Sequence, residues 1–473
     1  MIFTSFEFLL FFALVWSIRS RISSFGAEKW FLLGASYLFY MTWNVPCVLL
    51  IIASSLMDYT AGRLMGVAQD QRLRRIFLIC SVCLNLGLLS YFKYRNFFAE
   101  NIWTGLSVFG LHPKPIYFSV FLPVGISFFT FQSMTYTIDV YRRKLAPCRS
   151  LRDFLLYVAF FPQLISGPIV RAVDFLPQLA ARRRANWKEI EGGLYLFLLG
   201  AVKKMVISDG VAPFVDLIFA TPDRFDALSL FFGVLGYAVQ IYCDFSGYSD
   251  MAIGCARILG FHFPENFMMP YASRNITEFW RRWHITLSSW LRDYLYIPLG
   301  GNRKGAVRTY VNILLTMLLG GLWHGARWNF VIWGGLLGLG LVVHKLWISS
   351  PLAGRFAARR FLAPLANAFS HLLTLTLVCG CWIFFRAQTF TAATQILKGI
   401  LTLKHGDHML APQILMAVGG VTLIHLVVAK DSLLHDTLPQ GQVAKRVTVY
   451  ASLLILLVFF AVTNGAPFIY FQF

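Results

Sequence analysis

Two histidines are the residues of this chain best suited to chemistry. His284 lies in the stretch EFWRRWHITLSSW, and His324 lies in the apolar run NILLTMLLGGLWHGARW. An imidazole is costly to bury in a membrane-like segment, so it is a functional candidate by default. A neutral imidazole can take a proton from an alcohol and return it to a leaving group. Acyl transfer from a thioester to a hydroxyl requires this proton transfer, and it requires neither a metal nor a covalent serine.

The length of the apolar run predicts where His324 lies. The 13 residues of 309–321 make roughly 20 Å of helix, which is short of the roughly 30 Å hydrocarbon layer. We therefore expect His324 inside the membrane. Gly320, Gly321 and Gly325 flank it and allow a substrate or another backbone to approach closely. The alternative is a histidine that bonds a neighbouring carbonyl between helices.

The residues around His284 predict one amphipathic helix at the cytoplasmic boundary, begun by Asn275 and ended by Pro298. Asn275 and Glu278 resemble a capping box, and Glu278 and Arg282 are spaced for an i,i+4 ion pair. The apolar residues recur at helical spacing and turn His284 to the apolar side: Trp280, His284, Leu287 and Leu291. A hydrogen-bonded packing histidine is the equal alternative.

Four residues near the histidines form a candidate donor-binding set: Arg281, Arg282, Trp283 and Trp323. Guanidinium groups match the geometry of phosphates, so Arg281 and Arg282 can bind a phosphate-bearing donor. Contact with lipid headgroups is the alternative.

Two carboxylates, Asp244 and Asp250, lie in the apolar stretch QIYCDFSGYSDMA. They can orient a histidine or line a polar tunnel. A salt bridge to Arg257 or to another helix is at least as well supported by the sequence.

The composition defines an integral membrane protein, since 57% of the 473 residues are hydrophobic and 14% are charged. The net charge of +20 does not point to nucleic acid, because Lys and Arg gather in loops between apolar runs. Eight cysteines form no disulfide framework or zinc spacing, and no metal is expected. No GxSxG, phosphate-loop or HExxH motif occurs.

The apolar runs predict twelve spans, both termini outside, and one domain over residues 1–473. The expected spans are 3–18, 30–44, 46–62, 76–92, 117–140, 190–207, 229–255, 309–323, 328–348, 362–385, 410–429 and 447–464. The segment 153–171 is interrupted by Pro162, Gly167 and Pro168, so we expect a re-entrant hairpin shielded by protein.

The sequence resembles the membrane-bound O-acyltransferase family, and within it the bacterial alginate O-acetylation branch. The matching stretches are PQLISGPIVR at 162–171, CDFSGYSDMAIG at 243–254, FPENFMMPYASRNITEFWRRWHITLSSWLRDYLYIPLGGNR at 263–303, GGLWHGARWNF at 320–330 and PFIYFQF at 467–473. The resemblance implies an all-α polytopic membrane fold, with about 11–12 transmembrane helices plus re-entrant and amphipathic helices around a tunnel. It makes His324 the catalytic histidine and His284 the second family histidine.

The resemblance also implies an activity, an O-acetyltransferase of the bacterial inner membrane. Acetyl would come from a cytoplasmic thioester, acetyl-CoA or an acyl-carrier thioester, with no bound cofactor. It would cross the membrane, and a periplasmic SGNH-type, esterase-like partner would esterify an exported polysaccharide. Alginate is the expected acceptor, while relatives serve cellulose, other exopolysaccharides and peptidoglycan.

Tyr470 lies just beyond the last expected span. A tyrosine at the interface is usually an anchor. It is also a possible acyl relay, because a phenol forms a labile ester.

Two rival hypotheses assign the chain no chemistry of its own. One is a transporter or flippase, in which His324→Ala would alter transport without changing thioester turnover. The other is a scaffold subunit of a polysaccharide export complex, in which the histidines would be dispensable.

Overall fold

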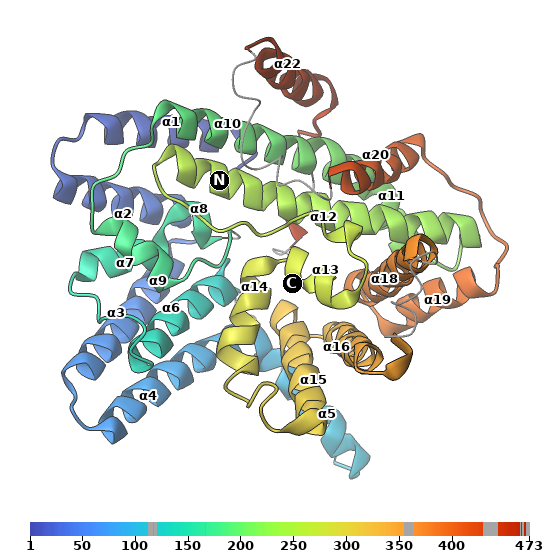
Figure 1. Cartoon of the computed structure of the whole chain (residues 1–473), viewed down its shortest axis with the longest axis horizontal. Coiled ribbons are helices and arrows are strands. Elements are labelled where there is room, and N and C mark those ends of the chain that lie inside the picture. Colours follow the sequence, from blue (N-terminus) through green and yellow to red (C-terminus); the bar gives the residue numbers. More distant parts are fainter. Residues whose placement is uncertain are drawn as a thin grey trace. The chain divides into compact units, whose positions relative to one another are not determined.

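The computed structural model describes residues 1–111, 117, 121–165, 167–353, 363–428, 443–463, 465 and 468–469 (Figure 1). Within these ranges the regular structure is helical, apart from one isolated bridge between Phe225 and Asp407. The predicted all-α fold is therefore confirmed. The chain forms two compact units, residues 1–194 with 252–264 and residues 195–251 with 265–473. The expectation of a single domain over 1–473 stays a prediction.

The first unit is built from helices of very different lengths. They are α1 (Phe6–Arg21), α2 (Phe25–Met41), α3 (Val45–Val67), α4 (Gln71–Leu89), η1 (Ser90–Tyr94), α5 (Arg95–Val108), α6 (Ile126–Tyr141), α7 (Leu151–Ala159), α8 (Phe161–Leu164), α9 (Ala172–Phe175), η2 (Leu176–Leu179) and the start of α10 (Trp187–Ala201). Side-chain oxygens cap the first turns of six of them, because the first backbone N–H groups of a helix have no partner within it: Ser5, Ser24, Asn44, Asp70, Ser150 and Asn186.

The interrupted segment 153–171 is broken and buried, as predicted. Helix α7 ends at Ala159, α8 covers only Phe161–Leu164, and no further helix begins before Ala172. Phe160 and Val170 are fully buried. A Cβ on Gly167 would lie 2.6 Å from the Gln163 Cα, so only glycine allows this close return of the chain. The depth of this hairpin in a membrane stays a prediction.

A buried carboxylate ties two basic segments of the first unit together. Glu28 is 2% exposed, and its oxygens lie 2.7 Å from Arg19 Nη2 and 3.0 Å from Arg182 Nε. Arg19 also donates a hydrogen bond to the Arg183 carbonyl, 3.0 Å away. Arg19 lies near the end of α1 and Arg182 lies beyond η2, so one buried carboxylate joins two basic segments that are distant in the chain.

We expect Glu28→Gln to destabilise the protein strongly. The change leaves two guanidinium groups beside a neutral amide, and loss of one partner of a buried ion pair typically costs about 3–5 kcal/mol. Glu189→Gln is the matched control, because the side chain of its partner Arg183 is 50% exposed and such a pair contributes about 1 kcal/mol or less. Thermal unfolding in detergent measures both. Equal small losses for the two variants would contradict a structural role for Glu28.

The second unit contains the longest helices and both candidate histidines. Its elements are the end of α10, η3 (Val202–Ser208), α11 (Asp209–Ala220), α12 (Ala227–Ile258) as far as Met251, η4 (Pro270–Ala272), α13 (Ile276–Arg282), α14 (Ile285–Leu291), η5 (Arg292–Tyr296), α15 (Gly305–His324), α16 (Trp328–Ile348), α18 (Ala363–Arg386), α19 (Phe390–Leu401), α20 (Pro412–Val428) and α22 (Val443–Phe460). Helix α19 was not predicted, since its threonines and lysine dilute the apolar pattern.

Helices α15 and α16 pack closely against each other (Figure 1). Glycines make the close approach possible. A Cβ on Gly321 would lie 2.2 Å from the Phe330 carbonyl oxygen, and one on Gly334 would lie 2.2 Å from the Met317 carbonyl oxygen. These distances leave no room for a side chain, so backbone packs directly on backbone at this crossing.

Each of the twelve predicted spans overlaps a helix, but in the part of the chain that the structure describes the span 117–140 is helical only from Ile126 and the span 447–464 only up to Phe460. Among the described residues, seven helical segments are long and apolar enough to cross a membrane: Val45–Val67, Gln71–Val108, Ala227–Ile258, Gly305–His324, Trp328–Ile348, Ala363–Arg386 and Val443–Phe460. The other predicted spans are shorter or carry more polar residues, and their crossing stays a prediction.

Candidate active site

His284 does not lie within one amphipathic helix, and that prediction is wrong. Helix α13 ends at Arg282, and His284 has φ +41°, a left-handed conformation that non-glycine residues rarely adopt. The segment 266–268 causes the break. The Arg282 carbonyl accepts from Met268 N at 2.9 Å, and Ile285 N donates to the Asn266 carbonyl at 3.0 Å. These bonds take the place of helical ones.

The predicted start of this helix is confirmed. The Asn275 side chain accepts a hydrogen bond from Glu278 N at 2.8 Å, and Glu278 pairs with Arg282 at 2.9 Å. The local signals were therefore correct for the first two turns only. A tertiary contact, which no local pattern encodes, ends the helix before His284.

Asn266 determines which nitrogen of the His284 ring carries the proton. The Asn266 Oδ1 atom lies 3.1 Å from His284 Nδ1, 2.9 Å from Thr286 Oγ1 and 3.3 Å from Thr286 N. Because the backbone N–H of Thr286 can only donate, the amide oxygen must face this cluster, so His284 Nδ1 must donate. Burial lowers the pKa of the imidazole below its usual value. A neutral ring protonated on Nδ1 keeps its lone pair on Nε2.

Sequence reasoning missed Asn266. It lies in the quoted stretch 263–303, but nothing in the spacing links position 266 to position 284. An asparagine just before the apolar stretch FMMPY is the only signal, and it is weak.

We expect Asn266→Asp to change the pH profile of the enzyme. A carboxylate at 266 stabilises the protonated ring and raises the pKa of His284. The neutral ring is then lost as the pH falls through the raised pKa, so activity should fall in mild acid where the wild type keeps its rate. Asn266→Ala removes the bond without adding charge, and should lower the rate by about tenfold or less without moving the acid limb. Identical acid limbs in all three proteins would contradict the contact.

Trp323 joins the two histidines. Its ring centroid lies 6.2 Å from that of His284 and 5.0 Å from that of His324. All three side chains are buried, with exposed fractions of 0% for His284, 4% for Trp323 and 3% for His324. Phe245 covers His284 edge-on at 4.6 Å, and Trp333 covers His324 at 4.9 Å. The structure thus gathers the two histidines into one aromatic cluster.

His324 is the last residue of α15, which begins at Gly305 rather than near Thr309. The helix has 20 residues, roughly 30 Å, so its length alone does not place His324 inside the hydrocarbon. Burial in protein does separate the imidazole from water, since Trp333 and Phe385 pack on it at 4.9 and 5.4 Å. Its depth in the membrane stays a prediction.

The predicted donor-binding residues occupy different surroundings. Arg281 is exposed, whereas Arg282 pairs with Glu278 and donates to the Met268 carbonyl at 3.3 Å. Trp283 is 1% exposed and packs on Phe279 at 5.6 Å and on Trp382 at 4.9 Å. Of the four, Trp323 is the residue that touches both histidines.

The two aspartates of α12 form buried ion pairs with consecutive lysines of η3. Lys203 Nζ lies 2.6 Å from Asp250 Oδ2, and Lys204 Nζ lies 2.7 Å from Asp244 Oδ1. The salt bridge to another helix is therefore the arrangement found. Sequence reasoning missed both lysines, although two adjacent cations inside a predicted span were a readable signal.

Tyr470 and most of the PFIYFQF stretch lie outside the described residues. Phe468 and Ile469 are described and buried, with 1% and 7% of their surfaces exposed. They place the start of this terminal stretch against α12, where Ile469 N donates to Asp244 Oδ2 at 2.8 Å.

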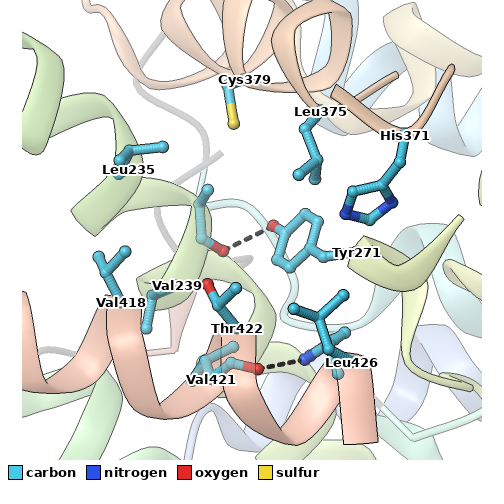
Figure 2. Close-up of a pocket in the computed structure, with 12 residues that line it drawn as sticks. Leu235, Val239, Tyr271, His371, Leu375, Cys379, Val418, Val421, Thr422 and Leu426 are labelled. Atoms are coloured by element: carbon cyan, nitrogen blue, oxygen red, sulfur yellow. Dashed lines mark hydrogen bonds between the residues drawn. The ribbon is translucent and has the colours of Figure 1, made fainter. Parts of the chain in front are cut away.

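A small pocket of about 80 Å³ lies between α12, α18 and α20 (Figure 2). Two of its polar side chains are bonded to its walls. The Tyr271 hydroxyl donates to the Ala238 carbonyl at 2.6 Å, and His425 Nδ1 lies 2.8 Å from the Val421 carbonyl oxygen (Figure 2). The pocket therefore presents mainly hydrocarbon, and neither His284 nor His324 lines it.

Comparison with known proteins defines the class of this protein. The model of MBOAT, the membrane-bound O-acyltransferase family, matches residues 30–379, a range that contains both histidines and the crossing of α15 and α16. The chain belongs to the membrane-bound O-acyltransferase family. It is a multi-pass membrane acyltransferase, and the predicted family resemblance is confirmed.

Several curated relatives are similar over most of their length. The probable alginate O-acetylase AlgI of Pseudomonas putida is 39% identical, with all of both chains covered. That of Pseudomonas aeruginosa is 41% identical over 91% of this chain and 81% of its own. The peptidoglycan O-acetyltransferase of Helicobacter pylori is 36% identical over 84% of this chain and 75% of its own. The protein is accordingly an O-acetyltransferase.

Proposed function

We propose that this O-acetyltransferase takes acetyl from a cytoplasmic thioester and passes it across the bacterial inner membrane to an exported polysaccharide. The observation that carries the proposal is the joining of His284 and His324 by Trp323 in one buried cluster. A pair of imidazoles held away from bulk water suits proton transfer at a hydroxyl during acyl transfer.

In this proposal His324 is the general base. It removes the proton of the acceptor hydroxyl as the oxygen attacks the thioester carbonyl, and a new C–O bond forms. The tetrahedral intermediate then breaks its C–S bond, and the imidazolium returns the proton to the departing thiolate. His284, neutral and donating to Asn266 through Nδ1, assists by accepting a hydrogen bond at Nε2 in the same cluster.

The donor is acetyl-CoA or an acyl-carrier thioester, and no bound cofactor takes part. Arg281 and Arg282 would bind its phosphates from the cytoplasmic side. Arg282 would give up its ion pair with Glu278 so that both guanidinium groups face the phosphates. Trp283 and Trp323 would line the path of the acetyl group towards the histidines.

Tyr470 is the proposed first acceptor. Its phenol would form an acetyl ester on the outer side, and a periplasmic SGNH-type partner would remove the acetyl and esterify the polysaccharide. Alginate is the proposed acceptor, because curated relatives that cover most of the chain carry alginate O-acetylase names. The peptidoglycan name of the Helicobacter pylori relative supports the second candidate.

Peptide mass spectrometry after incubation with labelled acetyl donor tests the proposed relay. Purified protein in detergent is given acetyl-CoA or acetyl-carrier protein, without a partner. We expect label on the C-terminal peptide of the wild type and none there in Tyr470→Phe. Steady thioester turnover with an unlabelled C-terminal peptide would exclude the relay while leaving the transferase reaction in place.

A further inference from the structure

The end of helix α10 and helix α12 cross at a pair of glycines. A Cβ on Gly200 would lie 2.4 Å from the Gly247 carbonyl oxygen, and one on Gly247 would lie 2.6 Å from the Gly200 carbonyl oxygen. The backbones therefore touch, and the two lysines that follow Gly200 reach the aspartates on either side of Gly247. Two ion pairs result, Lys203 with Asp250 and Lys204 with Asp244.

The lysines of the two ion pairs differ in their second partner. Lys203 Nζ has the Ser246 hydroxyl as its second partner, 2.9 Å away. Lys204 Nζ has a second carboxylate, Asp209 Oδ1, 2.8 Å away. Asp209, Lys204 and Asp244 thus form a buried cluster of two anions and one cation, which we call the carboxylate cluster. Their side chains are at most 4% exposed.

The segment that follows α22 attaches to this region at three points. Val462 N donates to the Met205 carbonyl at 3.0 Å. Gly465 packs so closely on Asp209 that a Cβ would lie 2.1 Å from Asp209 Oδ2. Ile469 N donates to Asp244 Oδ2 at 2.8 Å. Asp244 therefore gives one carboxylate oxygen to Lys204 and the other to the backbone of the terminal segment.

The same attachment reaches the histidine site through aromatic rings. Phe468 packs on Tyr248 at 4.5 Å and on Phe245 at 5.6 Å. Phe245 in turn covers His284 edge-on at 4.6 Å. A shift of Phe468 would therefore allow the Phe245 ring to move away from His284.

We propose that the carboxylate cluster clamps the C-terminal segment onto α12, and that Asp244 is a positioning residue for the His284 site. Ion pairing alone would need only one oxygen of Asp244. The other oxygen accepts the hydrogen bond from Ile469 N, and glycine at position 465 lets the segment approach Asp209. Both features hold the segment in place. The positioning role of Asp244 rests on the proposed catalytic function of the histidines, whereas the attachment of the segment does not.

Trimming of the full-length protein by a carboxypeptidase, followed by intact-mass spectrometry, tests the clamp without an activity assay. In the wild type, digestion should slow sharply when it reaches Ile469. In Asp244→Ala, removal of Ile469 and Phe468 should be about tenfold faster, because a hydrogen bond to a charged group is lost. Asp250→Asn is the matched control. It breaks the neighbouring ion pair on the same two helices but leaves the bond to Ile469.

Equal rates of trimming for the wild type and Asp244→Ala would overturn the proposal. Equal acceleration in Asp244→Ala and Asp250→Asn would also overturn it, because it would show that the helix crossing as a whole had loosened. If Asp244→Ala does not fold, Gly465→Ala replaces it. Its added methyl displaces the segment from Asp209 without removing a charge, and it should be trimmed faster in the same way.

A transfer assay tests the positioning role. Gly465→Ala displaces the segment but keeps Tyr470, and it should lower acetyl transfer. Asp244→Ala should lower transfer in the wild-type background but not in the Gly465→Ala background. If Asp244→Ala lowers transfer by the same factor in both backgrounds, the aspartate acts independently of the segment and the positioning role is wrong.

Discussion

Replacing His324 by alanine should lower the rate of acetyl transfer by about 10²–10⁴-fold, the usual contribution of a general base. The reason is that the change removes the proposed proton acceptor. It leaves the α15–α16 crossing intact, because Gly321 and Gly334 make that contact. Turnover of labelled acetyl donor by purified protein in detergent measures the effect.

His371→Gln is the control for this prediction. His371 also lies on a membrane helix, and its Nδ1 lies 3.2 Å from the Ser273 carbonyl oxygen. Glutamine can keep that hydrogen bond, and the residue lines the pocket of Figure 2, whose lining includes neither His284 nor His324, so transfer should stay close to wild type. A folded His324→Ala protein with a wild-type rate would exclude His324 as the base.

Gly334→Leu should disrupt the scaffold that carries His324. A side chain at 334 collides with the backbone carbonyl of Met317, which cannot turn away as a flexible side chain could. Overpacking of this kind typically costs about 1–3 kcal/mol or more. We expect a lower unfolding temperature in detergent and a loss of transfer, because separation of the helices moves the end of α15.

The neighbouring glycine supplies the control. A Cβ on Gly335 would lie 3.3 Å from Leu318 Cδ2, the tip of a flexible side chain. Gly335→Ala should therefore be tolerated with little change in unfolding temperature. Similar destabilisation by Gly335→Ala and Gly334→Leu would mean that loss of glycine, rather than the backbone contact, determines stability.

The sequence predicted the elements well because each depends on local chemistry. Long apolar runs gave the membrane helices, and the cap at Asn275 with the Glu278–Arg282 pair gave the start of α13. Prolines and glycines gave the break after α7. These signals act within a few residues, so one sequence suffices to read them.

The site was only partly predictable, since its decisive contacts join distant segments. Helical periodicity through residues 280–291 favoured one helix, but two backbone bonds to the segment 266–268 override it at His284. The partners of Asp244 and Asp250 are the lysines at 203 and 204, about forty residues earlier in the chain. Both histidines were identified in advance, whereas the tryptophan contact between them required the fold.

The most direct test of one shared centre is a double-mutant comparison. Single-turnover cleavage of labelled acetyl thioester is measured for the wild type, His284→Ala, His324→Ala and the double variant, at matched folding. Residues that act as a unit give strongly non-additive losses. If Trp323 joins the histidines in one catalytic centre, the double variant should be no slower than His324→Ala within error. Losses that multiply, with His284→Ala lowering the residual rate by its full single-variant factor, would show that the histidines act separately and contradict the shared site.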